Sequence, residues 1–218
     1  MDGNFGMDEI NERLIKGKER IAEAGRGKPR VAAPARNRLP PGQHEVKNWP
    51  VLDLGMQPEI PLDKWSLNIE GLVEQPKLLT WPDFMALPQV EKVADFHCVT
   101  TWSRFDNHWT GVEFKAICDL VKPKPEARFV LFTGYDGYST NLPLGLVLDD
   151  ALIIHRWEGQ LLEREHGGPV RVVVSKVYAW KGAKWVKDII FLPQDHPGFW
   201  EVRGYSNTAD PWTDDRFS

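Results

Sequence analysis

Short apolar runs rich in β-branched residues recur along the second half of the chain, and turns separate them. Four of these runs cover residues 129–132, 152–157, 170–174 and 185–191. Earlier in the chain, Trp65, Leu67 and Ile69 alternate with polar residues, and Gly71 closes the run. Runs of this length and composition are typical of β-strands. Because helical stretches are few and no long alternation of strand and helix occurs, the pattern predicts an α+β fold with one mixed, mainly β domain.

Three stretches are predicted to be helical. Residues 8–24 carry Ile10, Leu14 and Ile21 at helical spacing between charged residues, which is typical of a short amphipathic helix. A second helix starts at Thr80, a favourable N-cap, and ends before Pro88. The third covers residues 113–121.

The first helix is expected to lie outside the main domain. Residues 26–41, which follow it, are rich in Arg, Lys, Pro and Gly and are typical of an extended linker. The basic residues of this linker are either simply solvated or dock against an acidic redox partner. We therefore predict an N-terminal helix and basic linker over residues 1–37, and one domain over residues 38–218.

Composition excludes several functional classes. The chain has 218 residues and a formal net charge of -4, so there is no electrostatic case for binding nucleic acid. The charged N-terminus has neither the apolar segment nor the twin arginines of an export signal, and no apolar run is long enough to predict a membrane span. These features predict a cytoplasmic location. Ten tryptophans suit a β-rich core, or a core that surrounds a flat cofactor.

The chain has two cysteines, Cys98 and Cys118, and both are predicted to be reduced. Cys118 falls on the apolar face of the helix over residues 113–121 and is predicted to be structural. Cys98 follows an apolar run, at the end of a predicted strand, and polar or charged residues follow it. Such surroundings favour a reactive thiolate, which is also a preferred ligand of soft metals. The polar neighbours are Thr100, Thr101, Ser103, Arg104, Asp106, Asn107 and His108.

Two blocks of sequence resemble the sulfite oxidase family of molybdopterin enzymes. The segment FHCVTTWS, followed by HWTGV, is similar to the molybdenum-ligand segment of that family. The second block, EHGGPVRVVVSKVYAWKGAKWVKDI at residues 165–189, is similar to the family's cofactor-binding block. The resemblance extends from about residue 38 to the C-terminus. It implies the sulfite oxidase fold, a molybdenum-molybdopterin (Mo-MPT) cofactor and oxidoreductase activity.

The resemblance also implies roles for individual residues. Cys98 would be the thiolate ligand of molybdenum, and Tyr205 would donate a hydrogen bond to the oxygen that is transferred. From its position alone, close after Cys98 in the same predicted loop, Arg104 would attract an anionic substrate such as sulfite, unless Asp106 neutralises it and so favours a neutral sulfoxide. The alternative is that the two charges form a solvated surface pair. Ser206, where relatives often have histidine, weakens the match around Tyr205. The residues expected to bind the cofactor are His44, Asn48, Thr133, His166, Arg171, Gly182, Ala183 and Lys184.

The predicted function is transfer of an oxygen atom and two electrons to or from a small sulfur compound. Because the chain has no haem or iron-sulfur cysteine pattern, electrons would pass to or from a separate electron-transfer partner. One alternative is a protein that binds the cofactor without catalysis. Another is a zinc hydrolase that uses Cys98 with His97 and His108, although no paired-ligand spacing supports it.

Overall fold

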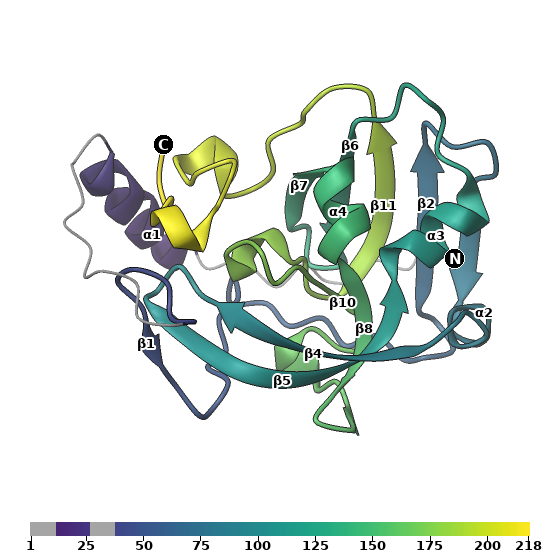
Figure 1. Cartoon of the computed structure of the whole chain (residues 1–218), viewed down its shortest axis with the longest axis horizontal. Coiled ribbons are helices and arrows are strands. Elements are labelled where there is room, and N and C mark those ends of the chain that lie inside the picture. The colour runs from purple at the N-terminus through teal and green to yellow at the C-terminus, as the bar shows by residue number, and fades with distance from the viewer. Residues whose placement is uncertain (1–11, 27–37) are drawn as a thin grey trace.

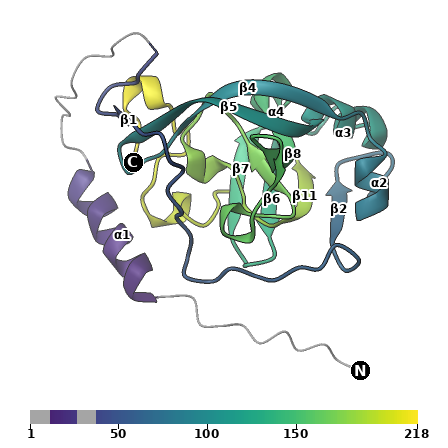
Figure 2. The ribbon, with the colours of Figure 1, turned by 90° about the horizontal axis from the view of Figure 1, so that it is seen from below.

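The computed structural model describes residues 12–26 and 38–218, which fold around two β-sheets (Figure 1). The long hairpin of the first sheet runs across the strands of the second (Figure 2). This architecture confirms the α+β prediction. The first sheet has the order β1 (His44–Glu45), β5 (Trp102–Glu113), β8 (Leu152–Trp157), β10 (Arg171–Val173), with β4 (Val90–His97) paired to β5 and β9 (Gln160–Leu161) to β8. The second has the order β3 (Lys77–Thr80), β2 (Ser66–Gly71), β11 (Val186–Leu192), β6 (Phe129–Gly134), β7 (Ser139–Pro143).

Most neighbouring strands are antiparallel, but β1 with β5 and β2 with β11 are parallel. Short helices connect the strands, and none in the described ranges is long and apolar enough to cross a membrane. The α2 helix starts as predicted, because Thr80 and Asp83 form a reciprocal capping box. The helices are α1 (Glu12–Gly25), α2 (Trp81–Met85), α3 (Phe114–Val121) and α4 (Leu144–Asp150), with 3-10 turns η1 (Arg164–His166), η2 (Ala179–Lys181), η3 (Glu201–Arg203) and η4 (Pro211–Thr213).

Apolar clusters cover the first sheet on both faces. On β8, Ile153 faces the main core, whereas Leu152 and Ile154 face a second cluster that contains Trp49 and Trp109. A strand that is buried on both sides is apolar at consecutive positions, which explains the continuous run at residues 152–154. The second cluster also holds Cys98.

Cys98 lies in the tight turn that joins β4 to β5. The Cys98 backbone N–H donates to the Trp102 carbonyl at 2.8 Å, and the Thr101 N–H donates to the Cys98 carbonyl at 3.1 Å. Thr101 has a φ of 75°, the left-handed backbone that a tight turn requires. The prediction that a strand delivers Cys98 to its end is therefore confirmed, and two long paired strands hold the thiol in place.

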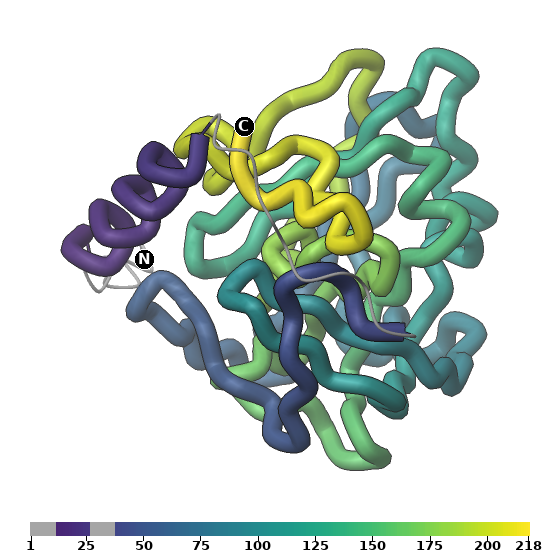
Figure 3. Tube along the Cα trace, turned by 60° about the vertical axis from the view of Figure 1, so that its left-hand side comes forward, coloured from purple at the N-terminus to yellow at the C-terminus, as the bar shows by residue number. Residues whose placement is uncertain are grey.

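The α1 helix packs against the C-terminal segment (Figure 3). Ala22 is fully buried, the Arg26 side chain donates to the Ser218 carbonyl at 2.9 Å, and Glu19 pairs with Arg203 at 3.1 Å. The predicted helix over residues 8–24 is thus present from residue 12, and residues 8–11 lie outside the described residues. Most of the predicted linker, residues 27–37, also lies outside them, and the domain boundary at residue 38 stays a prediction.

Candidate active-site cleft

One cleft gathers residues from distant parts of the chain. Its open volume is about 850 Å³, and its walls come from α1, the segment after β1, the β4–β5 turn, η1, β10, η2 and the C-terminal segment. Of the residues expected at the site, the structure brings six together here: Cys98, His166, Arg171, Gly182, Lys184 and Tyr205.

The Cys98 side chain is almost fully buried at one end of the cleft. Its Sγ lies 3.2 Å from the Thr100 hydroxyl, and the Gln43 side-chain amide donates to the Cys98 carbonyl at 3.1 Å. Burial raises the pKa of this thiol, and the hydrogen bond with Thr100 together with the positive charge of Lys18 offsets part of that effect. A bound cation at this end would favour the thiolate.

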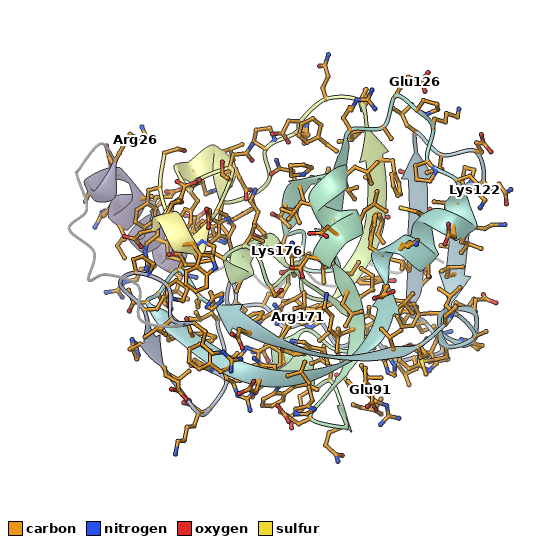
Figure 4. The ribbon with its side chains drawn as sticks, in the orientation of Figure 1. Arg26, Glu91, Lys122, Glu126, Arg171 and Lys176 are labelled. Carbon is orange, nitrogen blue, oxygen red and sulfur yellow. The ribbon has the colours of Figure 1, made fainter. Side chains whose placement is uncertain are left out.

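Arg171 is a buried cation that lies near the middle of the molecule (Figure 4). Its guanidinium donates to backbone carbonyls, at 2.9 Å to that of His166 and 3.4 Å to that of Gly182. Its charged group also lies 5.2 Å from the ring centre of Trp49 and 5.3 Å from that of Phe96. Arg171 forms no ion pair with any described residue. Since an unpaired buried charge is costly, an anionic ligand would stabilise this side chain.

Lys184 and His166 extend the positive character of the same wall. Burial, followed by the charge of Arg171, lowers the pKa of Lys184 to about 7. Burial and the same two cations lower the pKa of His166 to about 4, so the imidazole is neutral at neutral pH. Arg171 and Lys184 each lower the pKa of a neighbouring basic group, and Asp53, Asp136 and Glu165 offset this only in part at Lys184. This excess of positive charge fits a phosphate.

Aromatic rings form much of the remaining wall. The Trp49 ring stacks on the His166 ring at 4.0 Å with an angle of 8° between planes. Trp180, Trp185 and Trp200 also line the cleft. These flat surfaces fit a planar ring system and exclude water from it.

Tyr205 lies at the Cys98 end of the cleft. Burial, and then the negative charge of a Cys98 thiolate, raises the pKa of this phenol to about 12, so it keeps its proton at neutral pH. The side chain is 5% exposed, and its hydroxyl forms no hydrogen bond with the described residues. The hydroxyl is therefore available to donate to a bound molecule.

Gly182 is required by close backbone contact. A Cβ atom at this position would lie 2.5 Å from the Val172 carbonyl oxygen of β10. The adjacent Ala183 is fully buried and its carbonyl accepts from the Val172 N–H at 2.9 Å. Ala183 is not part of the cleft wall, so the pairing with β10 accounts for its position.

Three other expected cofactor contacts lie away from the cleft. His44 and Asn48 are exposed on and after β1, and Trp49, next in the chain, is the residue that turns inward. Thr133 ends β6 and its hydroxyl donates to the Asp188 carboxylate of β11. A strand-to-strand hydrogen bond therefore accounts for Thr133.

The expected position of Arg104 needs correction. Its guanidinium forms an ion pair with Glu158 at 3.0 Å, donates to the Lys47 carbonyl at 3.1 Å, and lies 4.7 Å from the ring centre of Trp157. Arg104 does not line the cleft, so it cannot attract substrate there. Asp106 does not neutralise Arg104 either; its partner is Arg38, at 2.9 Å.

Several wall residues escaped the sequence analysis. Lys18 comes from α1, which was expected to lie outside the domain, and nothing in its helical spacing indicates a site. Tyr138 follows the β6–β7 turn, and its side chain is buried in the wall and donates to the Trp180 carbonyl. Asp136, in that same turn, also lines the cleft, and burial raises its pKa to about 6.

The structure does not support the zinc alternative. Among the described residues, the one group of three close metal-ligating side chains is Glu163, Glu165 and His166, which excludes Cys98. His97, the proposed partner of Cys98, instead lies 2.8 Å from the Ser103 hydroxyl through its Nδ1.

Comparisons with known proteins agree with this geometry. Residues 54–200 match the family described as oxidoreductase molybdopterin binding domain. The chain is 42% identical to the uncharacterized oxidoreductase YuiH of Bacillus subtilis over 83% of this chain and 92% of the relative. It is 29% identical to the protein-methionine-sulfoxide reductase catalytic subunit MsrP of Campylobacter jejuni, over 63% of this chain and 52% of that subunit.

A solved structure shares the fold. The sulfane dehydrogenase SoxCD from Paracoccus pantotrophus superposes with a TM-score of 0.63 at 20% identity, covering 71% of this chain and 44% of that one. The mixed sheets described above are therefore those of the sulfite oxidase fold. With the family match over more than half of the chain, these findings show that the protein belongs to the molybdopterin-binding oxidoreductases of the sulfite oxidase type, whose cofactor is molybdenum-molybdopterin.

Proposed function

We propose that this enzyme transfers an oxygen atom and two electrons to or from a small sulfur compound, such as sulfite or a sulfoxide, and that its cleft holds the cofactor. The observation that carries the proposal is the pairing of two unlike features in one cleft. The buried thiol of Cys98 and the cations Arg171 and Lys184 line the same cleft. The names of the relatives MsrP and SoxCD support a sulfur compound as the substrate.

The residues present fit the cofactor. Arg171, Lys184 and the neutral His166 would hold its anionic end, because a guanidinium and an ammonium both bind phosphate oxygens. Trp49 and Trp185 would lie against its ring system. Cys98 would supply the thiolate ligand of the metal. When bound, molybdenum-molybdopterin supplies the exchange of one oxygen atom and two electrons.

Tyr205 would orient the substrate at the Cys98 end. Its hydroxyl keeps a proton at neutral pH and can donate a hydrogen bond to an oxygen atom of the substrate. The surrounding aromatic wall lowers the local dielectric constant, which strengthens such a bond. We further propose that a separate electron-transfer protein takes up or delivers the electrons.

The first experiment combines cofactor analysis with turnover. The protein is purified from a host that makes molybdopterin, and molybdenum is measured together with the fluorescence of released, oxidised pterin. We expect both in near-stoichiometric amounts, with oxidation of sulfite by an artificial electron acceptor or reduction of a sulfoxide by an artificial donor. Protein that carries molybdenum and pterin but turns over neither compound would contradict the proposed substrates.

The role of Cys98 is tested by Cys98→Ser, with Cys118→Ser as the control. Cys98→Ser removes the thiolate ligand, so we expect activity to be lost while pterin stays bound through Arg171 and Lys184. Cys118 is buried on α3, where burial raises its pKa to about 12, and its substitution should change only stability. Equal activity in both variants would refute the assignment. The measurements are steady-state rates and pterin content.

A further inference from the structure

Lys18 reaches the cleft from the N-terminal helix. Its side chain is half-buried and lines the cleft, with Nζ 5.1 Å from the ring centre of Trp200. Trp200 in turn packs against Tyr205, with 5.0 Å between ring centres. The positive charge of Lys18 lowers the pKa of Cys98, and burial lowers the pKa of Lys18 itself. Lys18 therefore belongs to the end of the cleft where Cys98 and Tyr205 meet.

The α1 helix is fixed in the position that places Lys18 there. Ala22, one turn further along the helix than Lys18, is fully buried. It packs against Gly204, where an added Cβ atom would lie 3.5 Å from the Cβ of Ala22. The ion pair of Glu19 with Arg203 and the hydrogen bond of Arg26 to the Ser218 carbonyl attach the helix at two more points. The contacted segment is the one that carries Tyr205, so α1 and Tyr205 are held together.

Lys18 has no ion-pair partner among the residues that the structure describes. Besides Cys98, the acidic group whose charge raises the pKa of Lys18 is Asp53. The Asp53 carboxylate instead accepts from the Gly55 N–H at 2.8 Å and from the Gln57 amide at 2.7 Å. The ammonium group is thus free to bind an anion that enters the cleft.

The other cations of the wall are held by backbone carbonyls. Arg171 is held by the carbonyls of His166 and Gly182, and Lys184 donates to the Glu165 carbonyl at 2.7 Å. Arg104 lies outside the cleft in its pair with Glu158. Arg171 also interacts electrostatically with Cys98, but among the described cations of the wall Lys18 is the one whose charged group donates to no backbone carbonyl and forms no ion pair.

We propose that Lys18 binds the anionic group of the substrate beside Cys98 and thereby selects a sulfur oxyanion over a neutral sulfoxide. This inference rests on the proposed function and names its substrate class. An ammonium group is a compact point charge that suits a small oxyanion such as sulfite, whereas the oxygen of a sulfoxide carries no net charge to attract it. Oxidation of sulfite to sulfate takes one oxygen atom from water and releases two protons and two electrons, which pass to the separate electron carrier.

The test compares Lys18→Met with Lys16→Met in the holoenzyme, using ferricyanide as electron acceptor and sulfite as substrate. Lys16 lies on the same helix but is exposed and pairs with Glu12. Lys16→Met therefore removes the same charge from α1 at a position that does not line the cleft. We expect Lys18→Met to raise the KM for sulfite about tenfold or more with little change in kcat, since a charge-assisted contact to bound substrate is lost. Lys16→Met should leave KM unchanged, and Lys18→Arg should restore most of the affinity.

A binding measurement separates this inference from the proposed function. Sulfate, an unreactive oxyanion, is titrated into each holoenzyme by calorimetry. Lys18→Met should raise the dissociation constant of sulfate by about the same factor as it raises the KM for sulfite. If no sulfur compound is turned over, the proposed function fails, and the sulfate affinities still decide the role of Lys18. If Lys18→Met binds sulfate as the natural enzyme does, or if Lys16→Met weakens binding equally, the inference is overturned.

A second pair of variants tests whether α1 must be docked. Ala22→Glu places a carboxylate at a fully buried position and should detach α1, because the charge cannot be buried without a partner. Ala24→Glu makes the same change at an exposed position of the helix. We expect Ala22→Glu alone to raise the KM for sulfite as Lys18→Met does, with faster hydrogen exchange in α1. Detachment of α1 with an unchanged KM would overturn the inference.

Discussion

Lys184 titrates close to neutral pH, and this makes cofactor loading sensitive to pH. Burial and the charge of Arg171 lower its pKa to about 7. An anionic phosphate favours the protonated lysine, so binding raises this pKa. Below about pH 7 the lysine already carries its proton, whereas above it the proton must be taken up on binding. We therefore expect loading of the apoprotein with molybdopterin to weaken by up to about tenfold as the pH rises from about 6 to 8.

A matched variant isolates the contribution of Lys184 to this pH dependence. In Lys184→Arg the guanidinium stays protonated across the whole range, so changes in ionisation of the cofactor itself affect both proteins equally. The measurement is the fluorescence of pterin retained after loading at each pH. A ratio of natural protein to Lys184→Arg that is constant with pH would contradict the assignment of Lys184 to the phosphate.

At single positions, the sequence located residues of the second block well and residues near Cys98 poorly. His166, Arg171 and Lys184 were found because one continuous block carries them into the same wall. Arg104 was misplaced although it shares a strand face with Trp102 and pairs with Phe96, both of which line the cleft. It lies further along β5 from the Cys98 turn, where Glu158 and the Lys47 carbonyl bind its guanidinium. Distance along the chain from Cys98 does not reveal these partners.

The 3-10 turns η2 and η3 are joined by a buried ion pair. Lys181 of η2 is fully buried and its Nζ lies 2.8 Å from the Glu201 carboxylate of η3. The same Nζ also donates to the Asn141 carbonyl at 3.1 Å, and Trp180 donates to Glu201 at 3.0 Å. Because η2 and η3 flank the wall that holds Trp180, Trp200 and Tyr205, this pair fixes the shape of the cleft.

We expect Lys181→Met to lower the free energy of unfolding by about 3–5 kcal/mol, since it leaves the Glu201 carboxylate buried without its partner. Lys187→Met is the control, because Lys187 is an exposed lysine on β11. The measurement is urea unfolding followed by tryptophan fluorescence. Replacing both partners, as in Lys181→Met with Glu201→Leu, should recover part of the loss. A cost for Lys181→Met no larger than that for Lys187→Met would show that the ion pair does not support the fold.

At the level of elements, burial decided what could be predicted. The strands β2, β6, β8, β10 and β11 were expected within a few residues of their observed ends, because their apolar residues follow the burial pattern. By contrast, β5 was not recognised as a strand of twelve residues, since the polar residues Ser103 and Asn107 occupy buried positions and interrupt the apolar pattern. The docking of α1 was missed for a different reason: its one fully buried residue among those described is a small one, Ala22.

In the molecule as a whole, the cleft is lined by parts that lie far apart in the sequence. Its walls include Lys18 near the N-terminus, Trp49, the Cys98 turn, Arg171 and Tyr205 near the C-terminus. Such convergence cannot be predicted from local patterns, because it depends on how the two sheets and the C-terminal segment pack. A ligand that contacts all these segments would cross-link them without a covalent bond.

Removal of the cofactor should therefore destabilise the entire fold. A ligand that binds only the folded state, at about a thousand times its dissociation constant, adds about 4 kcal/mol. For a chain of this size that corresponds to a rise in Tm on the order of 10 °C. We expect this difference between holoenzyme and apoprotein in calorimetry, with hydrogen exchange slowed on loading in the turn around Cys98, in residues 165–185 and around Tyr205.

Arg171→Met, which removes a buried cation of the wall, should abolish most of the rise in Tm, whereas Lys187→Met should leave the rise intact. If loading slows exchange only at one of these segments, the cofactor would not bridge them, and its place in the cleft would have to be reassigned.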